Sequence, residues 1–419
     1  MKKFVALLLA VLMLLSLVTA CSSNKTTDAP ADDPAQATTD STAADDSAAP
    51  AEDAAAASDS DLPEGSWKIG IITGTVSQTE EEYRAAQQMK ERYGEEHIVT
   101  ATYPDNFDSE QQQVIQTIKN MAQDPDIRCI IMCQAVSGTK TAFEEIKEDP
   151  DMEDILLVAG VPFEDPNVIT ASADIAIDAN HPDIGNTMVE QAKAMGAETF
   201  VFYSFARHMA QELVVQKRDN ARIKAEELGM TFVYTECVDP LGEQGVSGAQ
   251  QWILEDLPRK LEEYGDNVAF FATNCSLQVP IITTVLADQE HHSLYPLQCC
   301  PSPLHAMPEA LGLDIPDDKK ADIPYIINAE AEAVKAQGGE GRISTWAAPT
   351  DYSIIVGSTM YAIEYIKGNT NGKNDEAVYL KCMNQIVEGA EVNLAHCVDS
   401  QTGESYDNYY LFSSSYVTF

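Results

Sequence analysis

Short apolar runs alternate with amphipathic segments along most of the chain from Trp67 onward. Residues 68–73 form an apolar run typical of a buried strand, and residues 80–93 then repeat apolar side chains at helical spacing. Further strand-like runs cover residues 98–103, 129–133 and 155–160, with helical segments between them. Nearly continuous apolar strands separated by helices predict a parallel sheet that helices cover on both faces.

A second series of the same kind follows residues 168–177. Strand-like runs at residues 199–203, 230–235 and 268–273 alternate with helical segments. Residues 171–174 are expected to carry the chain across as a hinge between the two series. A predicted strand at residues 342–346 and a predicted helix at residues 353–367 are expected to return to the first.

The predicted fold class is therefore α/β, with two doubly wound parallel-sheet (βα) lobes joined by a hinge. We assign residues 65–173 and about 342–419 to the first lobe, and residues 174–341 to the second. Residues 296–324 are rich in proline and charge, and have the least regular pattern.

The N-terminus has the features of a bacterial lipoprotein signal peptide over residues 1–21. Lys2 and Lys3 precede an apolar run at residues 4–15, which is shorter than the ~20 residues that span a bilayer. Residues 18–21, VTAC, resemble a lipobox, and the resemblance implies that Cys21 carries lipid after processing. An uncleaved anchor helix is the alternative. Both predict a membrane-anchored protein that faces outside the cytoplasm.

Residues 22–64 contain Ala, Asp, Ser, Thr and Pro with almost no large apolar side chain, which predicts a disordered acidic tether. The whole chain carries 67 acidic and 26 basic side chains, a formal net charge of −41. This charge excludes a nucleic-acid partner, because binding to phosphates requires a basic surface.

Two lobes joined by a hinge, behind a lipobox and an acidic tether, resemble the type I periplasmic-binding proteins. Residues 178–185, DANHPDIG, resemble the hinge and second-lobe opening of that superfamily. Residues 202–209, FYSFARHM, resemble a family of Gram-positive lipoproteins known as domain of unknown function 3798. The first resemblance implies a solute receptor of an ATP-driven (ABC-type) importer. Sugar-responsive repressors share the fold, but no segment resembles a helix-turn-helix.

Ligand-binding residues are expected at the carboxyl ends of the strands, where the loops of two lobes converge on a crevice. The first lobe is predicted to contribute polar side chains and one aromatic: Thr73, Thr75, Ser77, Gln78, Gln134, Ser137 and Phe163. The second is predicted to contribute Tyr203, Ser204, Arg207, His208 and Asn274. Trp346 is expected to line the cleft or the interface between the lobes.

Arg207 is the most specific of these predictions. It follows a strand where a helix is expected to begin, so the guanidinium and the helix dipole would together favour a carboxylate or phosphate. An ion pair with a surface acid is the alternative. Tyr203 and Phe163 would stack on a ring or belong to the core. His208 would bind the ligand, cap its helix or face solvent.

The cysteines do not form a recognisable metal or disulfide motif. In a strand, Cys129 and Cys133 are separated by roughly 13 Å, which exceeds disulfide reach, so burial as small hydrophobes is expected. Cys299 and Cys300 could pair with Cys275 or with each other, although mostly free thiols are expected. No metal and no cofactor are predicted.

The sequence leaves three functions open. The first is a receptor that closes around a small polar or anionic metabolite and passes it to an ABC permease. The second is a receptor that presents its loaded form to a membrane sensor. The third is an enzyme in the cleft, with Cys275 or His208 as the reactive group. Because residues 245–248, GVSG, have the wrong spacing for a nucleophile elbow, a binding protein is favoured over a hydrolase.

Overall fold

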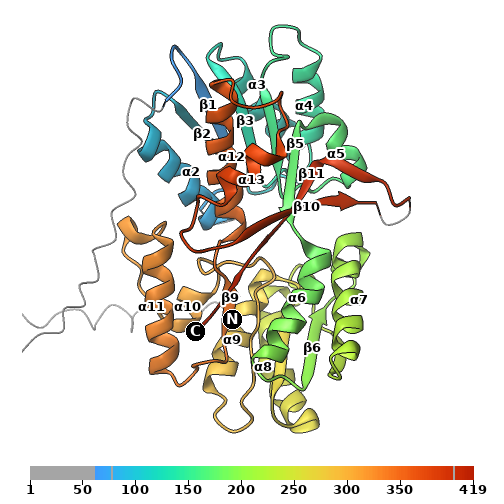
Figure 1. Ribbon diagram of the computed structural model, residues 1–419. Coiled ribbons are helices and arrows are strands. Elements are labelled where there is room, and N and C mark those ends of the chain that lie inside the picture. The colour runs from blue at the N-terminus through green and yellow to red at the C-terminus, as the bar shows by residue number, and fades with distance from the viewer. Residues whose placement is uncertain (1–61, 77–78, 400–401) are drawn as a thin grey trace, which may run out of the picture. The chain divides into compact units, whose positions relative to one another are not determined.

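The computed structural model describes residues 62–76, 79–399 and 402–419, all of which belong to one compact unit, Ala55–Phe419 (Figure 1). The predicted signal peptide, its Cys21 and nearly all of the predicted tether lie outside the described residues, as do Ser77 and Gln78. Within the described part of the chain, no helix combines the length and the apolar character needed to cross a bilayer.

The first lobe is built on a seven-stranded sheet with the order β10-β11-β5-β4-β3-β1-β2. Five of its strands run parallel and correspond to apolar runs of the sequence: β1 (Lys68–Thr73), β2 (Ile98–Thr102), β3 (Ile127–Cys133), β4 (Leu156–Gly160) and β5 (Ile175–Ala179). β11 (Ser405–Ser414) extends the sheet parallel to β5, and β10 (Val392–Val398) pairs antiparallel with β11.

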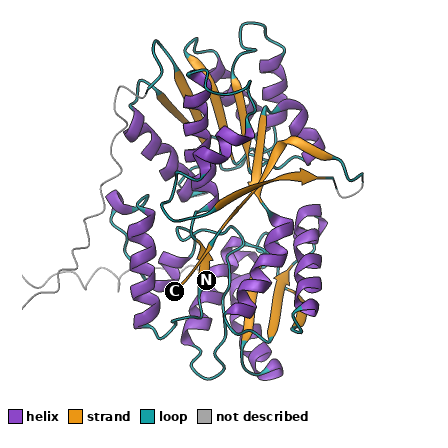
Figure 2. Cartoon of the chain, in the orientation of Figure 1, coloured by secondary structure: helices purple, strands orange, loops and turns teal. Residues whose placement is uncertain are grey.

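Helices cover both faces of this sheet (Figure 2). One face packs against α2 (Glu80–Tyr93), α12 (Thr350–Ile366) and α13 (Glu376–Met383), and the other against α3 (Gln111–Ala122), α4 (Thr139–Lys147) and α5 (Pro166–Ser172). Side chains of β3 alternate between the two cores: Cys129, Ile131 and Cys133 join the first, whereas Ile130 and Met132 join the second. This double burial explains the unbroken apolar run in its sequence.

The second lobe contains a parallel three-stranded sheet with the order β7-β6-β8. Its strands are β6 (Thr199–Ser204), β7 (Thr231–Glu236) and β8 (Val268–Ala272). α6 (His181–Ala194) and α7 (Glu212–Glu227) cover one face, and α8 (Gly245–Tyr264) and α9 (Gln278–Ala287) cover the other. The shorter α10 (Met307–Leu311) and the longer α11 (Ile323–Ala336) add to the hydrophobic cluster on the α8 and α9 face of this sheet.

The chain passes between the lobes three times (Figure 1). Hydrogen bonds join the three passages. The first passage links β5 to α6, the second links β9 (Ser344–Trp346) to α12, and the third links β11 to β12 (Tyr416–Thr418). The backbone N–H of Asn180 donates to Phe412 at 2.7 Å, and that of Ala347 donates to Ser415 at 2.9 Å. β9 and β12 also pair with each other as an antiparallel sheet.

These observations confirm the predicted α/β class and its two lobes. Two segments differ from the boundaries that the sequence suggested. β5 was expected to open the second lobe, yet it pairs with β4 and β11 in the sheet of the first lobe. Residues 342–346 were expected in the first lobe, but Ile343 bridges Tyr295 and β9 pairs with β12, on the side of the second lobe. The first passage between the lobes thus begins after Ala179, and the second begins after Trp346.

Candidate functional site

The two lobes meet where α2 faces the segment between α9 and α11. The Ser302 hydroxyl donates to Glu81 at 2.7 Å. The Lys320 ammonium lies 3.2 Å from the Glu80 carboxylate, and the Gln88 side chain donates to the carbonyl of Ala321 at 3.3 Å. Side chains of α2 therefore bind directly to the second lobe.

A group of carboxylates lies on the first-lobe side of this contact. Glu82 is fully buried, and only one of its oxygens is bonded, by the Thr79 hydroxyl at 2.8 Å. Its Oε1 has no hydrogen-bond partner among the described residues. Burial, together with repulsion from Glu81 and from Cys300 of the second lobe, raises the pKa of Glu82 to about 8. Burial and repulsion from Glu82 and Glu81 likewise raise the pKa of Asp351.

Ionisable side chains also cluster at the first passage between the lobes. Asp178, near the end of β5, is buried, and burial raises its pKa to about 7. His181 lies 3.6 Å from Asp178, and its buried Nδ1 has no partner among the described residues. Lys217 of α7 is also buried, which lowers its pKa, although Asp178 and nearby cysteines favour its charge. Buried ionisable groups with perturbed pKa values are typical of functional sites.

The structure brings together two of the predicted second-lobe residues, Ser204 and His208. The hydroxyls of Ser204 and Thr273 are 2.8 Å apart, and the same Thr273 hydroxyl lies 3.0 Å from Nδ1 of His208. Burial and then the Arg207 charge lower the pKa of His208 to about 4. Asn274, which follows β8, accepts a hydrogen bond from the backbone N–H of Ser276 at 3.0 Å. Together they form a polar edge at the carboxyl ends of β6 and β8.

Arg207 forms an ion pair with an acid, which the sequence analysis gave as the alternative to ligand binding. Its guanidinium donates two hydrogen bonds to Asp239, at 3.0 and 2.9 Å, and lies over the ring of Phe205. The segment after it is a three-residue 3₁₀ helix, His208–Ala210, and α7 begins only at Glu212. The α-helix expected to begin beside Arg207 therefore begins several residues later, and Asp239 already binds the guanidinium.

Two predicted aromatic residues lie in the core. Tyr203 is fully buried on the α8 face of the second sheet, and its hydroxyl donates to Asp256 at 3.1 Å. Trp346 is fully buried against the ring of Phe412. Neither side chain presents surface to a ligand, because both pack within the hydrophobic clusters that join the strands and helices.

The described first-lobe residues lie along the carboxyl ends of β1, β3 and β4. Thr73 is buried and donates to the carbonyl of Gly74, and Thr75 donates to Asp105 at 2.6 Å. Gln134 and Ser137 are half-buried in the loop after β3. Phe163 is 49% exposed and contacts the edge of Phe107.

Sequence reasoning missed most of the ionisable groups at the interface between the lobes. These are Glu81, Glu82, Asp178, His181, Lys217, Asp351 and His305. For Glu81 and Glu82, the sequence offers one signal, the run of three glutamates at residues 80–82, at the start of a predicted helix. Acids at that position ordinarily stabilise a helix N-terminus, so the pattern alone does not indicate a site.

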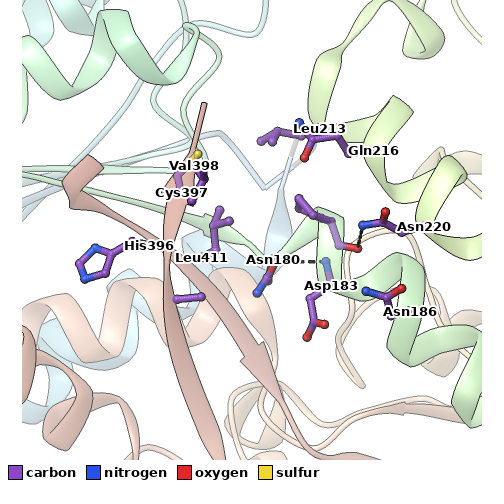
Figure 3. Close-up of a pocket in the computed structure, with 12 residues that line it drawn as sticks. Asn180, Asp183, Asn186, Leu213, Gln216, Asn220, His396, Cys397, Val398 and Leu411 are labelled. Atoms are coloured by element: carbon purple, nitrogen blue, oxygen red, sulfur yellow. Dashed lines mark hydrogen bonds between the residues drawn. The ribbon is translucent and has the colours of Figure 1, made fainter. Parts of the chain in front are cut away.

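A pocket of about 270 Å³ opens beside the first passage between the lobes. Figure 3 shows α6 and α7 of the second lobe on one side and β10 and β11 of the first lobe on the other. Asn180 caps α6 by accepting from the N–H of Asp183 at 3.2 Å, and Asn220 donates to the carbonyl of Pro182 at 2.9 Å. The wall is polar on the α6 and α7 side. None of the predicted ligand-binding residues lines it.

The fold is that of two parallel-sheet lobes, as in the type I periplasmic-binding proteins. A solved structure from Clostridium difficile 630, described as a candidate transcriptional regulator, aligns with a TM-score of 0.74 at 20% sequence identity, over 84% of this chain and 99% of that one. At this identity the similarity supports the fold alone. A sugar ABC-transport substrate-binding protein from Bordetella parapertussis aligns less well, at a TM-score of 0.49 and 9% identity, over 85% and 90% of the two chains.

The sequence of the chain also identifies its family. Residues 67–344 match the family model "Protein of unknown function (DUF3798)", and the chain belongs to that family, as the sequence resemblance indicated. An uncharacterized protein of Treponema pallidum (strain Nichols) is 31% identical over 182 residues, which is 42% of this chain and 81% of the relative. A second uncharacterized protein of that strain is 34% identical over 171 residues, or 40% and 76% of the two chains.

Proposed function

We propose that the protein is an extracytoplasmic solute receptor that captures a small polar ligand between its lobes and delivers it to an ABC permease. The observation that carries this proposal is the state of Glu82. A fully buried carboxyl group with an unpartnered oxygen costs free energy, and a ligand hydrogen bond would remove that cost. Binding that satisfies groups of both lobes at once would stabilise the closed form.

The ligand site would use facing groups from each lobe. Glu82, Gln134 and Asp351 would bind from the first lobe, and His208 and Lys217 from the second. The three acids near the contact, Glu81 included, favour a ligand that directs amines or hydroxyls toward the first lobe. The paired state of Arg207 gives less support to the anionic ligand that the sequence suggested.

The test is ligand-dependent stability of the full chain. Small molecules that copurify would be identified by mass spectrometry, and a panel of polyols, nucleosides, amines and carboxylates would be screened by thermal unfolding. At a hundredfold excess over the dissociation constant, a ligand should add about 2.7 kcal/mol to the free energy of unfolding. Glu82→Gln should weaken the effect, whereas Glu95→Gln, at an exposed acid of the same lobe, should not. No response to any compound would contradict the proposal.

Lipid anchoring through Cys21 and a tether over residues 22–64 belong to the same proposal. They are supported by the lipobox resemblance and by the polar composition of the segment that follows it. Mass spectrometry of the mature N-terminus tests them. A diacylglyceryl group on Cys21 is expected, and Cys21→Ser should release the protein from the membrane fraction. An unmodified Cys21 in membrane-bound protein would contradict the anchor.

A further inference from the structure

Three thiols and one imidazole converge in the second lobe. Cys275 begins the 3₁₀ helix Cys275–Leu277 after β8, and Cys299 and Cys300 lie in the segment after α9. The Sγ atom of Cys275 is 3.1 Å from that of Cys299 and 3.6 Å from that of Cys300, and the last two are 3.9 Å apart. A ring nitrogen of His305 lies within 4.8 Å of the sulfurs of Cys275 and Cys299.

These separations suit a common metal ligand sphere. With Zn–S bonds near 2.3 Å, a tetrahedral site places its sulfurs about 3.8 Å apart. Two of the three observed separations are close to that value, and the third, between Cys275 and Cys299, requires a modest outward movement of one side chain. All three distances exceed the roughly 2.05 Å of a disulfide bond, and all three cysteines are free.

The imidazole gives a second observation that points to a ligand. Nε2 of His305 is buried and has no hydrogen-bond partner among the described residues. Buried ring nitrogens are ordinarily hydrogen-bonded, so an unpartnered one calls for an explanation. A neutral imidazole nitrogen is also the commonest nitrogen ligand of a metal in proteins.

We propose that the second lobe binds one thiophilic divalent cation of the Zn²⁺ class through Cys275, Cys299 and His305, whose ligand atoms lie within 4.8 Å of one another, and that Cys300 completes the site after its side chain moves toward His305. The cation would form bonds to three sulfurs and one nitrogen, and three thiol protons would pass to solvent. The resulting site would carry a net charge of −1. Lys217, which is buried in the same lobe and attracted by all three sulfurs, would balance it.

The site would act on the face of the second lobe that meets the first. The segment that carries its ligands also supplies Ser302 to Glu81, and its Pro301 carbonyl accepts hydrogen bonds from Thr350, at 3.1 Å from the backbone N–H and 3.0 Å from the hydroxyl. A bound cation would hold residues 299–305 in this arrangement. The proposal does not depend on the captured solute, and it departs from the sequence-based expectation that no metal binds.

The experiment is a metal titration of the full chain. Protein purified without oxygen and stripped with a chelator would be titrated with Co²⁺ and then with Zn²⁺, and metal content would be measured by elemental mass spectrometry. One equivalent per chain is expected, with a thiolate-to-cobalt charge-transfer absorption that Zn²⁺ abolishes. Because loss of an outer-shell partner costs 10–100-fold in affinity, Cys275→Ser and Cys299→Ser should each weaken binding by more than about 100-fold.

Two further variants keep the result interpretable. Cys237→Ser removes another buried, free thiol of the second lobe that is outside the cluster, and it should leave affinity unchanged. His305→Gln keeps all three thiols and should shift the cobalt spectrum even if the cysteine variants fold poorly. Three results would overturn the proposal: no stoichiometric binding by the reduced protein, an equal loss in Cys237→Ser, or a disulfide within the cluster in anaerobically purified protein.

Discussion

Glu81 and Ser302 are joined across the two lobes by a hydrogen bond of 2.7 Å from the hydroxyl to the carboxylate. The other oxygen of the same carboxylate accepts from the backbone N–H of Tyr352 at 3.0 Å. One side chain of α2 thus binds both the second lobe and the start of α12. The contact connects the acidic group of the first lobe to the segment that carries Cys299 and Cys300.

Loss of this contact should favour the open form. A hydrogen bond typically contributes about 0.5–1.5 kcal/mol, so Ser302→Ala should lower the ratio of closed to open molecules by roughly 2–10-fold. Small-angle X-ray scattering would detect a larger radius of gyration. Ser109→Ala is the control, because that hydroxyl donates to Asn106 within the first lobe. Equal radii for the two variants would show that the contact does not govern closure.

The raised pKa of Glu82 predicts that stability falls with rising pH. Between its ordinary value of 4.5 and about 8, the unfolded chain has released a proton that the folded chain retains. The free energy of unfolding should therefore decrease by about 1.4 kcal/mol per pH unit for this one group, and the loss should be complete above pH 8. Urea unfolding across this range would measure the slope.

Glu82→Gln should reduce that slope, because the amide does not titrate. Glu81 and Asp351 also have raised pKa values, so part of the slope should remain. Glu95→Gln, at an exposed acid, should leave the slope as it is in the parent chain. A slope that Glu82→Gln leaves unchanged would mean that Glu82 is ionised in the folded protein.

The pair of Arg207 with Asp239 should contribute modestly to stability. Its guanidinium donates two hydrogen bonds, but 41% of the Arg207 side chain is exposed, and exposed pairs typically contribute about 0.2–1 kcal/mol. Arg207→Ala, Asp239→Ala and the double variant form a thermodynamic cycle whose coupling energy should lie in that range. A ligand whose thermal shift disappears in Arg207→Ala, but persists in Asp239→Ala, would restore the predicted role of Arg207 in anion binding.

A methyl group at Gly185 should separate α6 from α7. A Cβ atom there would lie 2.3 Å from the backbone carbonyl oxygen of Lys217, which has no room to move aside. At Gly357 of α12 the nearest atom is the flexible end of Met383, at 2.1 Å. Both substitutions gain about 1 kcal/mol in helix propensity. Gly185→Ala should nevertheless destabilise the chain by about 1–3 kcal/mol more than Gly357→Ala, as measured by urea unfolding.

The central parallel strands of the first lobe were predictable because they bury both faces. β1 and β3 appear in the sequence as unbroken apolar runs, and their observed bounds nearly coincide with those runs. β10 and β11 were not predicted, since their sequences mix Asn, Ser and Asp with apolar residues. β11 belongs to the sheet because it pairs with β5, more than two hundred residues away along the chain, and no local pattern indicates that pairing.

The candidate site was less predictable for a related reason. Strand ends and loop polarity indicate where a ligand could approach, and they pointed to the loops after β6 and β8. They do not identify partners that come from distant segments. Arg207 is bound by Asp239, and Glu82 is influenced by Cys300 and Asp351, which lie in other parts of the chain. Only the folded arrangement brings such charges together.

The three passages between the lobes restrict how the lobes can move. A single passage would leave the lobes free to rotate about its axis. Three passages, joined by the hydrogen bonds from Asn180 to Phe412 and from Ala347 to Ser415, resist twisting of one lobe against the other. They still permit all three passages to bend together. The lobes should therefore open and close about one axis. The same side chains should then regain contact each time the lobes close.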